Sequence, residues 1–99
     1  MIIYSIEIYL KKEICQNWYQ WMQRKHIPDI MRTDLFKRFT FYENVKTEGM
    51  CNHIIQYHAT SFDKYIKYQQ EHQIKFQTEH SFKFKDGFFA KRSLFIEIN

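Results

Sequence analysis

The sequence predicts an α+β domain in which strands and helices follow one another in the order β-α-β-β-α-β. Three observations carry this prediction. Apolar residues alternate over residues 2–10, an apolar stripe at helical spacing follows over 14–22, and Ser61 stands where an N-cap is expected before a second stripe. With 99 residues, the chain is long enough for one domain and too short for two. We therefore expect a single domain over residues 1–99.

The first strand and the first helix are the most clearly patterned elements. Ile2, Tyr4 and Ile6 point to one side of the expected strand, and Glu7 points to the other. The helix that follows has four apolar residues at i, i+4, i+7 and i+8. These residues are Ile14, Trp18, Trp21 and Met22. The spacing places all four on the side that packs against a sheet.

Pro28 is expected to end this first helix. It has no N–H to donate, and it disfavours helical dihedral angles at Ile27, so we expect the helix to end near His26. Proline also suits the first position of a helix, which predicts a short additional turn that carries Ile30 and Met31.

The second half of the chain predicts two adjacent strands, a second helix and a last strand. Ser61 is the expected N-cap of that helix, and Asp63 lies in its first turn, where the helix dipole favours an acid. The Asp86–Gly87 pair predicts a turn before the last strand. The expected ranges are a strand over 35–45, a strand over 52–60, a helix from Phe62 to a point before Phe82, and a strand over 88–98.

This order of elements, joined by right-handed crossovers, predicts a ferredoxin-like antiparallel sheet with both helices on one face. The expected strand order is 4-1-3-2, which makes the first and third strands central. Alternation divides the side chains between the two faces, but it leaves the register of the last strand open. Phe89, Phe95, Lys91 and Arg92 are all candidates there for the face without helices.

The face without helices is expected to carry Ile3, Tyr9, Tyr42 and Ile54, which would form a large exposed apolar patch. We therefore expect a homodimer in which two sheets face one another and form a shared α+β barrel. Polar residues on that face have two interpretations: a paired network in the interface, or part of a cavity that binds a small molecule. The candidates for such a cavity are Glu7, Tyr9, Arg38, Tyr42, Gln56, His58 and Arg92.

Composition narrows the class of protein. The net charge of +4 is spread along the chain with acids between the basic residues, so we do not expect nucleic acid as a partner. The start has no basic opening and no long apolar core, and no stretch approaches the ~20 apolar residues of a membrane span. We expect a cytoplasmic protein that does not associate with a membrane. Cys15 and Cys51 are expected as free thiols, Cys15 buried and unreactive, although sequence leaves a disulfide open.

Four stretches together resemble a family of small uncharacterised bacterial proteins, a domain of unknown function in the dimeric α+β-barrel superfamily. The most specific is the pattern W-x-x-W-M-x-x-x-H-I-P followed by an acid, from Trp18 to Asp29. The chain has Asp34 where such proteins often have a glycine, so a backbone conformation that needs glycine is open to question there. The four stretches are MIIYSIEIYL, WYQWMQRKHIPDIM, IIQYHATSFDKY and FFAKRSLF. The resemblance implies the fold and no established activity.

No activity is established by the sequence, and whether the chain is an enzyme stays open. The first hypothesis is a non-catalytic homodimer that binds a small apolar or aromatic molecule between its sheets. The second, by analogy of fold, is a cofactor-independent monooxygenase or a haem-degrading enzyme, with His26 or His58 as base or ligand and Tyr42 and Arg92 orienting the substrate. His26 also has a simpler interpretation as a cationic residue at a helix C-terminus.

Other kinds of site find little support. The five histidines form no HxxxH or HxH pair, and His53 and His58 should point to opposite faces of a strand, so we expect no metal site. No cofactor is expected, with haem as the alternative. An RNA-binding module is a third hypothesis, because KDGFFAKRSLFIEI distantly resembles an RNA-recognition motif. Its spacing is wrong, and it lies on the last strand instead of the third.

Overall fold

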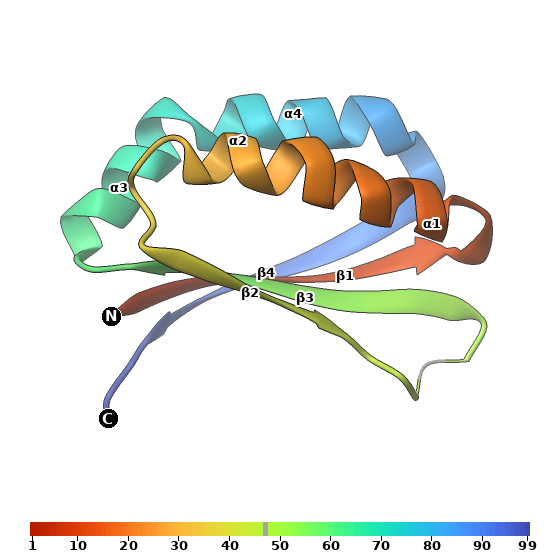
Figure 1. Cartoon of the computed structure of the whole chain (residues 1–99), viewed down its shortest axis with the longest axis horizontal. Helices are drawn as coiled ribbons and strands as arrows, with labels where there is room; N and C mark the ends of the chain where they lie inside the picture. The colour runs from red at the N-terminus through yellow and green to blue at the C-terminus, as the bar shows by residue number, and fades with distance from the viewer. Residues whose placement is uncertain (47) are drawn as a thin grey trace.

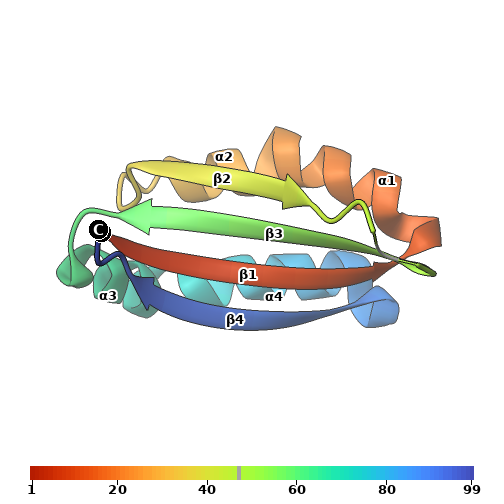
Figure 2. The ribbon, with the colours of Figure 1, turned by 90° about the horizontal axis from the view of Figure 1, so that it is seen from below.

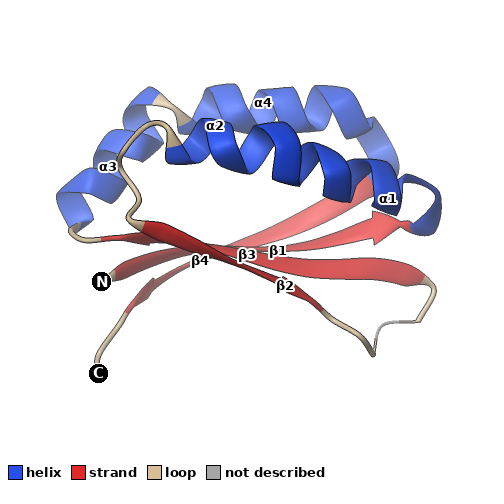
Figure 3. Cartoon of the chain, viewed as in Figure 1, coloured by secondary structure: helices blue, strands red, loops and turns tan. Residues whose placement is uncertain are grey.

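The computed structural model describes residues 1–46 and 48–99. A four-stranded antiparallel sheet carries all of the helices on one face and leaves the other face uncovered (Figure 1). The strand order is β2-β3-β1-β4, as predicted (Figure 2). The elements, coloured by type in Figure 3, are β1 (Ile2–Lys11), α1 (Lys12–Trp21), the π-helical segment η1 (Met22–His26), α2 (Ile27–Met31), β2 (Arg38–Glu43), β3 (Met50–Ala59), α3 (Phe62–Glu71), α4 (Gln73–Phe84), the 3-10 turn η2 (Lys85–Gly87) and β4 (Phe88–Ile96).

The first helix does not end at His26, which corrects the sequence prediction. It widens into the π-helical segment, where the N–H of Ile27 donates to the carbonyl of Met22, and it continues as α2. Pro28 sits in the first turn of α2, where its missing N–H is tolerated. The wider π turn also removes the clash that a proline ring makes with the carbonyl four residues earlier in an α-helix. Ile27 therefore keeps helical dihedral angles before a proline.

Asp34 takes the left-handed backbone conformation, with φ of +62°. The loop after α2 therefore has a conformation that favours glycine, although the chain has none at this position. Aspartate is among the few non-glycine residues that visit this region at modest cost. The absence of glycine does not prevent the turn.

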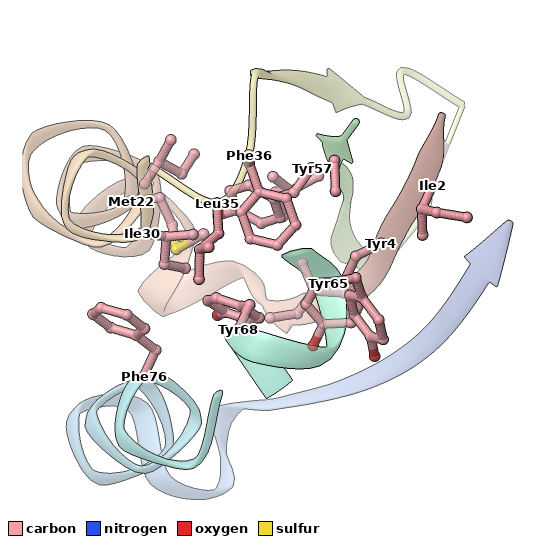
Figure 4. Packing of buried hydrophobic residues seen from close by; sticks show 14 of the residues in the cluster. Ile2, Tyr4, Met22, Ile30, Leu35, Phe36, Tyr57, Tyr65, Tyr68 and Phe76 are labelled. Carbon is pink, nitrogen blue, oxygen red and sulfur yellow. The ribbon is translucent and has the colours of Figure 1, made fainter. Parts of the chain in front are cut away.

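The second strand is shorter than predicted. It begins at Arg38, because Leu35 and Phe36 are consecutive residues that are both buried in the core. Neighbours on a strand point to opposite faces, so these two residues take a loop conformation instead. The Phe36 ring lies 5.2 Å from Tyr57 and 4.8 Å from Tyr68, which ties the loop to the sheet and to α3 (Figure 4).

The second helix begins as predicted and ends later. The Ser61 hydroxyl accepts a hydrogen bond from the backbone N–H of Lys64 at 3.2 Å, which makes it the expected N-cap. The helix is interrupted at His72 and resumes as α4, which runs to Phe84 and beyond the predicted end. The buried positions of α4 are Phe76, His80 and Phe84, at a spacing of four residues. Polar and charged neighbours concealed this stripe in the sequence.

The sheet register shows which side chains share the uncovered face. Directly opposite residues form four rows across the strands; three rows run from β2 to β4, and the fourth runs from β3 to β4. The register also settles β4: Phe89, Lys91 and Phe95 lie on the uncovered face. The rows are Arg38–His58–Ile3–Phe95, Thr40–Gln56–Ser5–Ser93 and Tyr42–Ile54–Glu7–Lys91, with Asn52–Tyr9–Phe89 at the end. Among the described residues, no helix is long and apolar enough to span a membrane.

Candidate functional site

A groove of about 670 Å³ lies between the first helical segment and strand β2. The helical wall comes from α1, the π-helical segment and α2, and the opposite wall comes from β2 and β3. The π turn lies along this wall, and such turns recur at functional sites. The lining residues are Cys15, Gln16, Tyr19, Gln23, Ile27, Pro28, Met31, Phe39, Phe41, Tyr42, Glu43 and His53.

Three rings form the centre of the groove. His53 lies 5.5 Å from Phe41 and 6.1 Å from Tyr19, between ring centroids, and Tyr19 and Phe41 lie 5.7 Å apart. Burial lowers the pKa of His53, so its imidazole is neutral at neutral pH. The side-chain amide of Gln23 donates to the Tyr19 hydroxyl at 3.1 Å and fixes its position. The groove thus combines aromatic walls with one neutral imidazole.

Cys15 and Cys51 form a disulfide next to the groove, which corrects the expectation of two free thiols. The bond joins α1 to β3 across a Cα–Cα distance of 6.3 Å, and Cys15 also lines the groove. Its sulfur lies 4.0 Å from Nε2 of His53. Both cysteines are half-buried, so Cys15 is neither free nor fully enclosed, contrary to expectation.

Six of the seven predicted cavity residues share the uncovered face of the sheet: Glu7, Tyr9, Arg38, Tyr42, Gln56 and His58. They do not enclose a cavity in a single chain. Gln56 joins Thr40 and Ser5 through contacts of 3.4 Å, and the Tyr9 hydroxyl donates to Glu7 at 3.4 Å. Tyr42 is the one member of the predicted set that also lines the groove.

Arg92 lies on the opposite face, which corrects its assignment to the predicted cavity. It pairs with Ile6, on the helix-covered side, and lines a small internal cavity near His80. The open register of the last strand caused the error, because a shift of one residue moves every side chain to the other face.

His26 lies inside the core and not at the end of a helix. Its ring stacks on Trp21 at 4.7 Å and faces His80 at 5.8 Å. Burial, with a smaller effect of His80, lowers the pKa of His26 to about 3, so it does not act as a cationic cap. The cavity beside it measures about 40 Å³, far below the roughly 300 Å³ at which sites for small organic ligands begin, and has no room for haem.

His58 lies in the outer row of the uncovered face, between Arg38 and Ile3. It is only 5% exposed, and neither ring nitrogen has a hydrogen-bond partner among the described residues. Burial is the main cause that lowers its pKa, and Arg38 lowers it further. His58 is thus a buried histidine without a hydrogen-bond partner among the described residues.

Sequence reasoning missed the groove. It placed Trp18 and Met22 correctly in the core but did not identify Tyr19, Phe39 or His53 as groove-lining residues. One signal was present: a proline within a continuous helical pattern indicates an irregular helix. Within residues 1–46 and 48–99, no three metal-binding side chains come together.

Solved structures share this fold at low sequence identity. A Deinococcus radiodurans protein classed among antibiotic biosynthesis monooxygenases has 13% identity and a TM-score of 0.75, with 100% of this chain and 94% of that chain covered. SnoaB, a cofactor-independent oxygenase from Streptomyces nogalater, has 12% identity and a TM-score of 0.67, covering 99% and 94%. A dimeric ferredoxin-like protein from an uncultured marine organism has 7% identity and a TM-score of 0.70, covering 99% and 96%.

These similarities show the ferredoxin-like fold that the strand order indicates. No curated protein sequence matches the chain. The model of a domain of unknown function, DUF4286, matches residues 1–98, and the chain therefore belongs to the DUF4286 family.

Proposed function

We propose that the chain forms a homodimer and that each subunit binds a small apolar or aromatic molecule in its groove. The groove itself supports this proposal most strongly. Its volume of about 670 Å³ falls within the roughly 300–1,000 Å³ typical of small-molecule sites. Phe39, Phe41 and Tyr19 offer flat apolar surfaces, while Gln16, Gln23 and Glu43 supply a few polar groups for orientation. That composition suits an aromatic molecule with one or two polar substituents.

A charge placed in the groove tests the binding proposal. Phe39 is 42% exposed and lines the groove, so Phe39→Glu should abolish binding of a fluorescent apolar probe such as 8-anilinonaphthalene-1-sulfonate. Phe82 is an exposed phenylalanine on α4 that does not line the groove, and Phe82→Glu is the matched control. Equal probe affinity in the two variants would contradict a binding site in the groove.

The uncovered sheet face supports the homodimer. Tyr42, Phe89 and Phe95 are each about half exposed there, and large apolar side chains that share one exposed face favour an interface. His58 has two unpaired ring nitrogens on the same face, and a second subunit or interfacial water would supply their partners. The similar marine protein is dimeric by its description, which fits this arrangement.

In such a dimer the polar residues of the uncovered face would lie between the two sheets. We propose that Gln56, Glu7 and Tyr9 pair across this interface, together with Arg38 and His58. Gln56 and Glu7 already take part in contacts within one chain, so the addition of a partner extends an existing network. A ligand chamber between the sheets is the alternative use of the same residues, and it requires the second copy.

Oxygenation of the bound molecule without a cofactor is a second candidate function. His53 favours it, because this residue lines the groove and its lowered pKa keeps the imidazole in the form that accepts a proton. A similar fold occurs in SnoaB. Oxygen uptake with a phenol that binds the groove should fall in His53→Ala and persist in His72→Ala, a histidine on the helix interruption. Equal uptake would exclude His53 as the base.

We further propose that the protein works in the cytoplasm, without a resident cofactor and without nucleic acid. The scattered charges of the chain support the last point. In the cytoplasm the Cys15–Cys51 disulfide would be transient or redox-active, because disulfides of proteins in reducing compartments mostly are.

A further inference from the structure

The Cys15–Cys51 disulfide joins α1 to β3 beside the groove. Cys15 lies in the N-terminal half of α1 and lines the groove, whereas Cys51 lies on β3 beside Leu10 of β1 and does not line it. Both cysteines are half-buried and not fully enclosed, which is a condition for a dissolved thiol to reach the bond. The two sulfurs therefore differ in access: one faces a ligand-sized space and the other is held in the sheet.

His53 gives Cys15 a proton acceptor. The two cysteines and His53 share the helix-covered side, because Cys51 and His53 are two residues apart on one strand. Nε2 of His53 lies 4.0 Å from the Cys15 sulfur, close enough to take the thiol proton once the disulfide is open. The nearby N-terminus of α1 also favours a negative charge on Cys15.

We propose that Cys15 and Cys51 are a redox-active pair in which Cys15 attacks small-molecule disulfides that enter the groove and Cys51 resolves the product. The class of substrate is a low-molecular-weight organic disulfide. The proposal rests on the groove as the place where small molecules bind, and it adds to that function a covalent reaction at one named sulfur.

The reaction balances as ordinary thiol–disulfide exchange. The Cys15 thiolate attacks one sulfur of the small disulfide; a Cys15 mixed disulfide forms, and one small thiolate leaves with the proton that His53 took from Cys15. Cys51 then loses its proton, its thiolate attacks the Cys15 sulfur and restores the Cys15–Cys51 bond, and the second small thiolate leaves and takes up that proton. In total, one dithiol and one small disulfide become one protein disulfide and two small thiols. A dithiol reductant opens the protein disulfide again and is itself oxidised.

Two single-cysteine variants test the assignment. Cys51→Ser leaves Cys15 as the only thiol, and Cys15→Ser leaves Cys51 as the only thiol. With glutathione disulfide as the probe, intact mass should show a mixed disulfide on Cys15 about tenfold faster than on Cys51, since attack needs an accessible thiolate. Adding His53→Ala to Cys51→Ser should slow this reaction several-fold, whereas adding His72→Ala should not.

The wild-type chain provides a second readout that needs no cysteine variant. Dithiothreitol should open the bond in the folded protein: intact mass after alkylation would show the two thiols, and an unchanged helix signal in circular dichroism would show that the chain stays folded. Brief alkylation should then label Cys15 before Cys51, and glutathione disulfide should restore the crosslink. Equal labelling rates, faster labelling of Cys51, or a bond that opens only when the chain unfolds would each overturn the proposal.

The probe that tests the groove separates this inference from the proposed function. If 8-anilinonaphthalene-1-sulfonate binds and the two thiols react alike, the groove stands and the redox pair fails. If the probe does not bind but Cys15 reacts faster and depends on His53, the thiol chemistry stands and the proposed ligand site fails. If small disulfides reach Cys15 through the groove, Phe39→Glu should slow the reaction of Cys15 with glutathione disulfide. An unchanged rate would exclude the groove as the route of entry.

Discussion

The indole nitrogen of Trp18 donates a buried hydrogen bond of 2.8 Å to Nε2 of His80, which joins the first helix to α4. Trp18 is fully buried, so its N–H has no access to water. This bond adds a polar link between two elements that also meet through the aromatic contacts of Trp21 with His80 and Phe84.

Removal of His80 should leave the indole N–H unpaired. We expect His80→Leu to lower the free energy of unfolding by about 1–3 kcal/mol, because a buried donor without an acceptor keeps its full desolvation cost. Urea denaturation measures the change. Ser81→Leu, at the exposed neighbouring position, is the control and should change stability far less. A His80→Leu variant as stable as the wild type would show that the bond contributes nothing.

Acid should destabilise the chain through its buried histidines. Burial lowers the pKa of His26 to about 3 and that of His80 to about 4, below the 6.5 of an unfolded histidine. As the pH falls below 6.5, the unfolded state binds protons first, so stability is lost from pH 6.5 down toward these lower values. As the pH falls from 6.5 to 5, each of these two histidines should lower the free energy of unfolding by on the order of 1 kcal/mol or more.

Unfolding curves at pH 6.5, 6.0, 5.5 and 5.0 measure this loss, in a range above most carboxylate titrations. His26→Leu should reduce the slope of stability against pH, while His72→Leu should leave most of it. The same slope in all three proteins would place the acid sensitivity elsewhere.

The disulfide should stabilise the folded chain as well as offer a reactive bond. Its two cysteines are 36 residues apart. A crosslink over such a separation restricts the unfolded chain and so raises the free energy of unfolding by about 2–4 kcal/mol. The midpoint of urea denaturation should therefore fall when dithiothreitol is present. The Cys15→Ser, Cys51→Ser double variant should show this lower midpoint without reductant and no further change with it.

Ser61 should act as the cap of α3. Its hydroxyl accepts from the Lys64 N–H at 3.2 Å, so Ser61→Ala should cost about 1 kcal/mol and Ser61→Asp should retain most of the stability. Thermal unfolding compares the three proteins. If alanine and aspartate behave alike, the hydroxyl is not a functional cap.

The strand order could be predicted from the sequence because the order of the elements and right-handed crossovers allow few topologies, and the alternation of residues predicts the face of each side chain. Tyr4 and Tyr57 are buried, and Tyr42 lies on the other face, where the pattern placed it. The continuation of the helix past Pro28 could not be predicted, since propensity rules describe an α-helix and the chain uses a π turn before the proline. Asp34 takes the left-handed backbone conformation that favours glycine, although no glycine at this position indicated it.

The groove escaped prediction for a different reason. It depends on how far the first helical segment stands from the edge strand β2, and no local pattern encodes that separation. Cys15 and His53 are 38 residues apart in the chain and meet only through the sheet. Sequence reasoning therefore recognised the residues of the uncovered face, which share a strand pattern, and missed the residues of the groove, which do not.

We propose that the uncovered face of the sheet packs against a second copy of the chain. Native mass spectrometry of the purified protein at micromolar concentration tests it most directly. We expect a dimer, which carries a small molecule where one is retained, and conversion to monomer in Phe89→Lys but not in Phe82→Lys. A wild-type protein that is monomeric under these conditions would contradict the account.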